Sequence, residues 1–89
     1  MATLVFAASL RRHVDAPAAQ LDGATLRAVL DAYFAAHPSV KSYVLDDQGA
    51  VRKHVAIFRN GTLIGDRAGL TDPVREADEI YVVQALSGG

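Results

Sequence analysis

Hydrophobic and polar positions in the first part of the chain predict a strand, a polar turn and a weaker second strand. Residues 3–8 form an apolar, β-branched run that is typical of a buried strand. Residues 11–17 are polar and contain a proline, as is typical of a hairpin turn. Residues 18–21 have a poorer strand propensity, but their position favours a short returning strand. The chain therefore begins with a predicted hairpin.

The next segment has the clear signal of a helix, because its apolar residues recur at spacings of three and four. These residues are Leu26, Val29, Leu30, Tyr33 and Phe34. Thr25 can cap the first turn by accepting a hydrogen bond from a free backbone amide. Pro38 disfavours helical geometry at His37. We therefore expect a helix over residues 26–36, with one apolar stripe that packs on a sheet.

The second half of the chain contains the strongest hairpin signal. Residues 54–59 and 62–64 resemble strands and flank the pair Asn60-Gly61. Asparagine and glycine both accept positive φ, which the tight turn between two twisted strands requires. Between the helix and this hairpin, residues 40–45 form an apolar patch without regular periodicity.

The last predicted strand, over residues 78–86, has the best strand composition in the chain. With two hairpins flanking one helix, the apolar stripe of the helix should lie across one face of a mixed sheet. The sequence thus predicts an α+β roll in which four to five strands pack on one main helix. We expect one domain over residues 1–86, followed by a flexible tail at residues 87–89.

Composition narrows the possible functions of this domain. The 89 residues are 51% hydrophobic and 21% charged, with a net charge of −1, which excludes intrinsic disorder and argues against a nucleic-acid-binding module. No apolar run is long enough to span a membrane, and residues 1–10 are too short and uncharged for a signal peptide, so we expect a soluble cytoplasmic protein. The chain contains no cysteine, which excludes disulfides, cysteine zinc sites and thiol nucleophiles.

Candidate chemistry inside the domain is sparse. The three histidines, His13, His37 and His54, are too widely spaced to indicate a metal site. Asp46-Asp47 adjoins a glycine and is typical of a turn. The basic clusters at residues 11–13 and 52–54 fit either solvated hairpin ends, which we favour, or anion sites. We therefore expect no enzyme active site, no metal and no bound cofactor in the domain itself.

The C-terminus has chemistry of its own, because the last predicted strand leads directly into Ser87-Gly88-Gly89. Two glycines can thread a channel that is too narrow for any residue with a side chain. No substituent blocks attack on the carbonyl carbon of Gly89 once its carboxylate is activated. The alternative interpretation is a frayed chain end that happens to consist of glycines.

Several segments together resemble a known family, the ubiquitin-like sulfur carriers of the MoaD/ThiS group, which have the β-grasp fold. The resemblance covers almost the whole chain, and its most specific parts are the acidic pair before the last strand and the terminal Gly-Gly. The matching segments are residues 4–8 with Leu10-Arg11, residues 24–27 with Leu30, residues 55–61, residues 77–82 and residues 85–89. The chain departs from the family at Ala77, where glycine is usual, and at Arg59, where an apolar residue is usual.

The resemblance implies a function for the terminal carboxylate. A partner adenylating enzyme, related to ubiquitin-activating enzymes, would use ATP to join the carboxylate of Gly89 to AMP. Gly88, which has no side chain, would let the chain end enter the narrow channel of that enzyme. A persulfide or sulfide would then displace AMP and leave a thiocarboxylate. This group would donate sulfur to an acceptor synthase or large subunit, in molybdopterin synthesis or in a related thiamine or cysteine pathway. The domain would then be a co-substrate, and its partners would supply the catalysis.

Strand alternation predicts which residues face those partners. If Ile80 and Val82 point to the helix, Tyr81 and Val83 point away from it. With the tail residues next to the last strand, the predicted partner-binding set is Ala7, Phe58, Leu63, Tyr81, Val83, Leu86 and Ser87. The resemblance itself places partner-facing positions at Ala7, Leu63 and Val83. A register shifted by one residue would instead put some of them in the core.

Two other functions remain open at this stage. The chain could be a protein modifier, joined through Gly89 to a lysine amine as ubiquitin is. It could also be a plain β-grasp binding module that uses its sheet face and has an idle tail.

Overall fold

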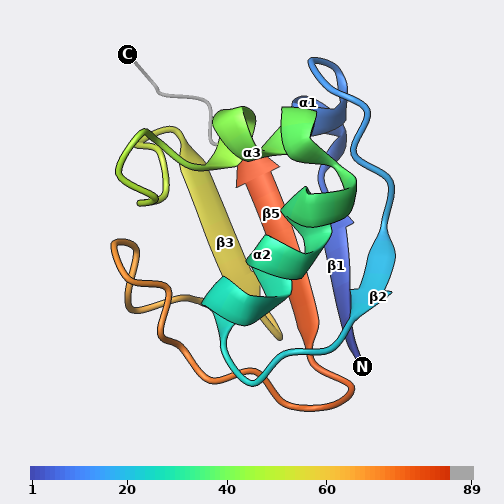
Figure 1. Cartoon of the computed structure of the whole chain (residues 1–89), viewed down its shortest axis with the longest axis vertical. Coiled ribbons are helices and arrows are strands. Elements are labelled where there is room, and N and C mark those ends of the chain that lie inside the picture. The colour runs from blue at the N-terminus through green and yellow to red at the C-terminus, as the bar shows by residue number, and fades with distance from the viewer. Residues whose placement is uncertain (85–89) are drawn as a thin grey trace.

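Five strands form one mixed sheet in the computed structural model, which describes residues 1–84 (Figure 1). The strands are β1 (Ala2–Phe6), β2 (Ala19–Leu21), β3 (Val55–Arg59), β4 (Thr62–Leu63) and β5 (Glu79–Gln84). The helices are α1 (Ala8–Arg11), α2 (Leu26–Ala36) and α3 (Pro38–Val44). The strand order is β2-β1-β5-β3-β4, in which β1 and β5 are parallel and the other neighbours are antiparallel. This arrangement confirms the predicted α+β roll.

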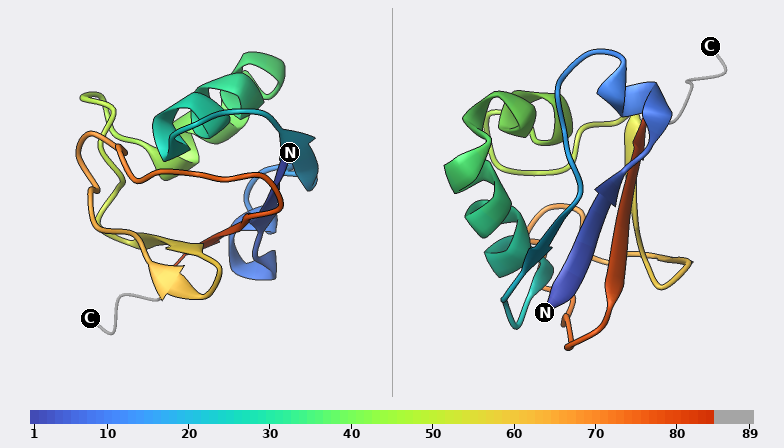
Figure 2. Two further views of the ribbon diagram at one scale, coloured as in Figure 1. Left: turned by 90° about the horizontal axis from the view of Figure 1, so that it is seen from below. Right: turned by 90° about the vertical axis from the view of Figure 1, so that its right-hand side faces the viewer.

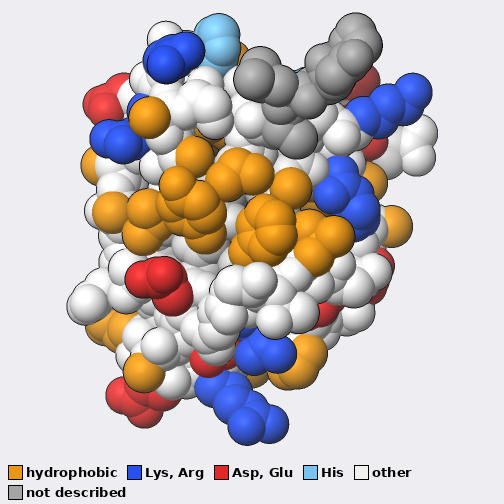
Figure 3. Space-filling view, turned by 180° about the vertical axis from the view of Figure 1, so that it is seen from behind, with side chains coloured by type: hydrophobic (Ala, Val, Ile, Leu, Met, Phe, Trp, Pro, Cys, Tyr) orange, Lys and Arg blue, Asp and Glu red, His pale blue; other side chains and the backbone are white. Residues whose placement is uncertain are grey.

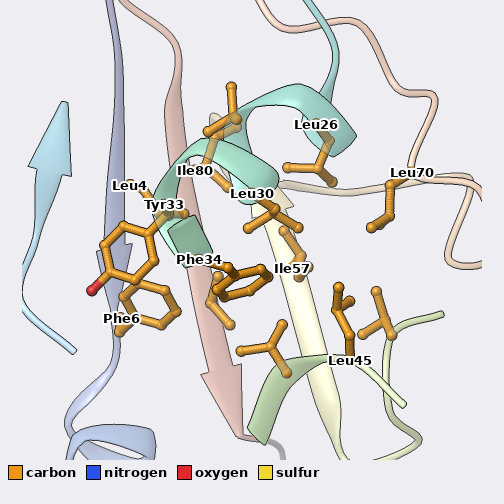
Figure 4. Close-up of a cluster of buried hydrophobic side chains, with 14 of the residues drawn as sticks. Leu4, Phe6, Leu26, Leu30, Tyr33, Phe34, Leu45, Ile57, Leu70 and Ile80 are labelled. Carbon is orange, nitrogen blue, oxygen red and sulfur yellow. The ribbon is translucent and has the colours of Figure 1, made fainter. Parts of the chain in front are cut away.

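The hydrophobic core lies between the sheet and α2, as Figure 4 shows. Leu30 and Tyr33 of α2 are fully buried, and they face Leu4 and Phe6 of β1 and Ile57 and Ile80 of the central strands (Figure 4). The ring of Tyr33 packs against that of Phe6 with their centroids 4.9 Å apart, and its hydroxyl donates a hydrogen bond to the carbonyl of Pro17 at 2.7 Å. The apolar stripe of α2 therefore covers the inner face of the sheet, as expected.

The first strand ends earlier than its composition predicts. Ala8 was expected in the strand and residues 11–17 in a hairpin turn, but β1 ends at Phe6 and Ala8 begins α1. The amides of Leu10 and Arg11 both donate hydrogen bonds to the carbonyl of Ala7, which forms this single helical turn. Burial of the Leu10 side chain holds the turn in place, since only 1% of that residue is exposed.

The apolar patch at residues 40–45 mostly belongs to the helix α3 and is not an irregular segment. Pro38 begins α3 at its first turn, where its missing amide hydrogen and fixed φ are tolerated. Val40 and Val44, spaced by four residues, lie on the same side of α3 and are fully buried. Pro38 thus stops α2 and starts α3, so the two helices cover the same face of the sheet (Figure 2).

The tight hairpin has the predicted turn chemistry. Asn60 and Gly61 both have positive φ, 50° and 84°, between β3 and β4. At the other predicted turn, Asp46 accepts hydrogen bonds from the amides of Gln48 and Ala50, and Gly49 has a φ of 81°. Both turns are therefore confirmed in position and in mechanism.

The predicted cap of α2 provides a test of the fold. The hydroxyl of Thr25 accepts a hydrogen bond from the amide of Ala28 at 3.2 Å. We expect Thr25→Ala to lower the free energy of unfolding by about 1 kcal/mol, since a first-turn amide loses its partner. Thr25→Ser keeps the acceptor and is the matched control in urea unfolding. Equal loss in the two variants would contradict a role for the cap.

Candidate functional site

The face of the sheet opposite α2 and α3 carries a row of apolar side chains that crosses four strands. Val5 pairs with Tyr81, Tyr81 pairs with Phe58, and Phe58 pairs with Leu63. These four side chains therefore lie next to each other across β1, β5, β3 and β4. Figure 3 shows hydrophobic side chains gathered across the middle of this face. We call these four residues, together with Ala56 and Val83, the outer row.

Burial confirms that the strands have the predicted register. Ile80 and Val82 of β5 and Ile57 of β3 are completely buried on the inner face. Tyr81, by contrast, is 40% exposed and Leu63 is 53% exposed. A side chain alternates from one face to the other along each strand, so Phe58 and Val83 lie on the same outer face as Tyr81.

Ala7 does not belong to the exposed row, although it was predicted there. Only 9% of Ala7 is exposed, and its amide donates a hydrogen bond to the carbonyl of Val82 at 2.8 Å. The residue ends the pairing with β5 and precedes α1, so it offers little surface to a partner. Sequence reasoning missed Val5 and Ala56, although alternation with the buried Phe6 and Ile57 places both on the outer face.

The point where the chain leaves the sheet is defined by its neighbours. Gln84, the last described residue, pairs with Val55 at the start of β3. On the other side, the hydroxyl of Ser9 in α1 donates a hydrogen bond to the carbonyl of Gln84 at 3.4 Å. The predicted site residues Leu86, Ser87, Gly88 and Gly89 lie outside the described residues. What the structure establishes is that they follow a central strand.

Asp78, the first residue of the acidic pair at the start of β5, has a structural role in this chain. The carboxylate of Asp78 accepts hydrogen bonds from the Asn60 side chain and the Arg75 amide, both at 2.8 Å, and from the Arg59 guanidinium at 3.2 Å. The amide of Glu79 donates to the Asn60 side chain. The Arg75 amide first, and then Asn60 and Arg59, hold the pKa of Asp78 below its ordinary value. Asp78 thereby fixes the hairpin turn to the start of β5, and Arg59 contributes a partner at that junction.

A second carboxylate network orders the loop before β5. Asp66 accepts hydrogen bonds from the Thr71 hydroxyl at 2.6 Å and from the Gly69 amide at 2.8 Å, and these lower its pKa to about 2. Asp72 accepts from the amides of Gly65 and Asp66, which lower its pKa as well. These aspartates therefore satisfy backbone groups of the loop.

These lowered pKa values predict a loss of stability in acid. Asp66, Asp72 and Asp78 stabilise the folded state at pH values above 3.8, the ordinary pKa of an aspartate in the unfolded chain. This contribution is lost as pH falls through the lower pKa values of the folded state. The urea midpoint should therefore stay level from neutral pH down to about 5 and fall between about pH 4 and 2. Asp66→Asn should make the fall shallower. If the urea midpoint of Asp66→Asn falls with pH as steeply as that of the wild type, this role for Asp66 is contradicted.

The histidines and acidic residues singled out in the sequence are not gathered into a metal-binding group among residues 1–84. In the described part of the chain, no group of three His, Asp or Glu side chains is placed to hold a metal ion. Arg27 donates to the carbonyls of Gly49 and Ala68, so it ties α2 to two loops. Among residues 1–84, no helix is long and apolar enough to cross a bilayer.

Comparisons with known proteins agree with this geometry. The model of the ThiS family matches residues 4–89. Small archaeal modifier protein 1 (SAMP1) of Haloferax volcanii is 36% identical over 70 residues, which cover 78% of this chain and 76% of that protein. A crystal structure of SAMP1 from Haloferax volcanii matches with a TM-score of 0.77 and 28% identity, over 99% of this chain and 98% of that one. A chain of the Amycolatopsis orientalis BexX/CysO complex matches in fold, with a TM-score of 0.81 at 19% identity over 100% of both chains.

Proposed function

Because the chain belongs to the ThiS family and has the ubiquitin-like β-grasp fold, as expected from its sequence, we propose that it is a sulfur carrier. In this proposal the carboxylate of Gly89 is adenylated by a partner enzyme and converted to a thiocarboxylate that donates sulfur in cofactor biosynthesis. The observation that carries the proposal is that the family match extends through the terminal Gly-Gly to residue 89. The chain acts as a co-substrate in the cytoplasm, and its partners supply the catalysis.

The chemistry follows from the weak electrophilicity of a carboxylate. An oxygen of the Gly89 carboxylate attacks the α-phosphorus of ATP and releases pyrophosphate, which leaves a mixed anhydride with AMP. A sulfide or persulfide sulfur then attacks the carbonyl carbon, and AMP departs with its bridging oxygen. Where a persulfide is the donor, its sulfur–sulfur bond must afterwards be cleaved by a thiol. The chain has no cysteine, so a backbone carboxylate is its available place for carrying sulfur by this route.

The outer row is the surface that we propose for docking on the adenylating enzyme and on the sulfur acceptor. Phe58 and Tyr81 form the centre of the row, and aromatic side chains are enriched at the positions that dominate binding energy. The row lies on the sheet that contains β5, so a partner seated on it is also close to the residue from which the tail continues. Molybdopterin synthesis, or a related thiamine or cysteine pathway, is the expected destination of the sulfur.

A second candidate function is protein modification through Gly89. The observation that favours it is the 36% identity with a protein named as a small archaeal modifier. The activated intermediate would be the same, but a lysine amine would take the place of sulfide and form an amide with loss of AMP. A plain binding module, with an idle tail, would need neither ATP nor Gly89.

One experiment separates these functions. The purified chain is incubated with its adenylating enzyme, ATP and sulfide. The mass of its C-terminal peptide is then measured by mass spectrometry. We expect a gain of about 16 Da, from replacement of oxygen by sulfur, which disappears when ATP is omitted. Amide-linked conjugates to lysine in cell extracts, without the mass gain, would support the modifier. If neither the mass gain nor lysine conjugates are found, the result would support the binding module.

A further inference from the structure

Two basic clusters that are far apart in the sequence meet at one end of the sheet. The first, Arg11, Arg12 and His13, begins at the last residue of α1, which follows the end of β1. Because β1 and β5 are parallel, α1 lies at the end of β5, where Ser9 contacts Gln84. The second cluster, Arg52, Lys53 and His54, precedes β3. Since Val55 pairs with Gln84, this cluster lies at the same end, on the other side of β5 (Figure 1). We call the six residues the cationic rim.

Contacts within the domain hold parts of the cationic rim in place and leave other parts available. Arg11 donates through Nε to the carbonyl of Phe6, and Arg52 donates through Nε to the carbonyl of Ser42. Arg12 and Lys53 are exposed, and their side chains make no hydrogen bond or ion pair with another residue in the range 1–84. The second cluster also lines an open hollow of about 300 Å³ together with Asp46, whose carboxylate accepts two backbone amides of its own turn.

The opposite end of the sheet has a different charge. Glu76, Asp78 and Glu79 lie there, at the start of β5. Three cations lie near them: Arg59 is paired with Asp78, the N-terminal amine lies 3.7 Å from Glu76, and Arg75 is exposed. The chain as a whole has a net charge of only −1. Four of the nine Lys and Arg residues therefore lie at the Gln84 end of the sheet, whereas the three acidic residues named above lie at the other end.

From this placement we propose that the cationic rim docks on acidic side chains of the protein that receives the C-terminal tail. The inference rests on the proposed function and specifies the surface of its partner. An apolar centre with charged groups at its edge is the usual anatomy of a protein interface, and the outer row adjoins the cationic rim. Charges at the edge of an interface chiefly steer association and fix orientation. A nucleic acid is a poorer fit, because the net charge is negative and the neighbouring surface is apolar.

The test reverses one exposed charge at a time. Arg12→Glu and Lys53→Glu should each raise the KM for this chain in ATP–pyrophosphate exchange by the adenylating enzyme about tenfold at low salt, with kcat unchanged. The difference from the wild type should shrink in high salt, because exposed charges are screened. Arg75→Glu is the matched control, since it changes the net charge equally at the opposite end of the sheet and should leave KM unchanged.

A second measurement keeps this inference separate from the proposed function. Amide chemical shifts of residues 11–13 and 52–54 should move when a hexaglutamate peptide is added, in the absence of ATP and enzyme. If the wild type supports no pyrophosphate exchange, the proposed function fails, and the peptide titration still decides whether the cationic rim binds carboxylates. If exchange is normal but Arg12→Glu and Lys53→Glu behave like Arg75→Glu, the inference is overturned. Larger shifts with a hexauridylate than with hexaglutamate would also overturn it.

Discussion

Deletion of Gly88 and Gly89 should abolish adenylation of this chain, and Gly89→Val should lower kcat/KM for pyrophosphate exchange by at least about a hundredfold. The physical reason is that the carboxylate must reach the α-phosphate of ATP through a passage shaped for residues without side chains, and small displacements of reacting groups are costly. Gly89→Ala should be intermediate. The measurement is the rate of pyrophosphate exchange at several concentrations of each variant.

The control for these tail variants is the stability of the domain. In the described part of the chain, residues 1–84, the core is built from residues between Ala2 and Val82. The chain without Gly88 and Gly89 should therefore unfold at the same urea concentration as the wild type. A loss of pyrophosphate exchange with an unchanged urea midpoint is then caused by the change in the tail and not by unfolding of the domain. Normal exchange by Gly89→Val would contradict a route through a narrow passage, and normal exchange by the deletion would contradict the proposed function altogether.

The second large effect is expected at the centre of the outer row. Tyr81→Asp should raise the KM for the adenylating enzyme roughly thirtyfold or more, because it removes a central aromatic contact and leaves a carboxylate to be desolvated. Tyr43→Asp is a close control, since Tyr43 and Tyr81 have the same exposed fraction, 40%, and Tyr43 lies on α3 on the other face. Equal KM values for the two variants would show that the partner does not bind the outer row.

The long helix α2 was predictable from the sequence, and the two short helices were not. The bounds of α2, residues 26–36, were predicted correctly, because its apolar spacing, the Thr25 cap and Pro38 all act locally. The helices α1 and α3 have one or two turns, and such short helices are held by tertiary burial and not by propensity. Leu10 supplies that burial for α1, and Val44 contributes it for α3.

The candidate site was likewise predicted in part. Phe58, Leu63, Tyr81 and Val83 were placed correctly on the outer face, because period-two alternation follows from strand geometry alone. Ala7 was misplaced, since the alternation was continued one residue beyond the end of β1. The structural role of Asp78 could not be seen in the sequence, because its side-chain partners Asn60 and Arg59 are 18 and 19 residues away. The meeting of the two basic clusters likewise depends on the topology of the sheet.

The parallel pairing of β1 with β5 has a mechanical consequence. The two strands run side by side from Thr3 with Glu79 to Phe6 with Val82, so tension applied at Gly89 and at the N-terminus pulls them in opposite directions along their length. The ladder bonds between them are then loaded together in shear, and none can be peeled away first. Force applied to the two ends therefore has to break several of these bonds at once before the domain opens.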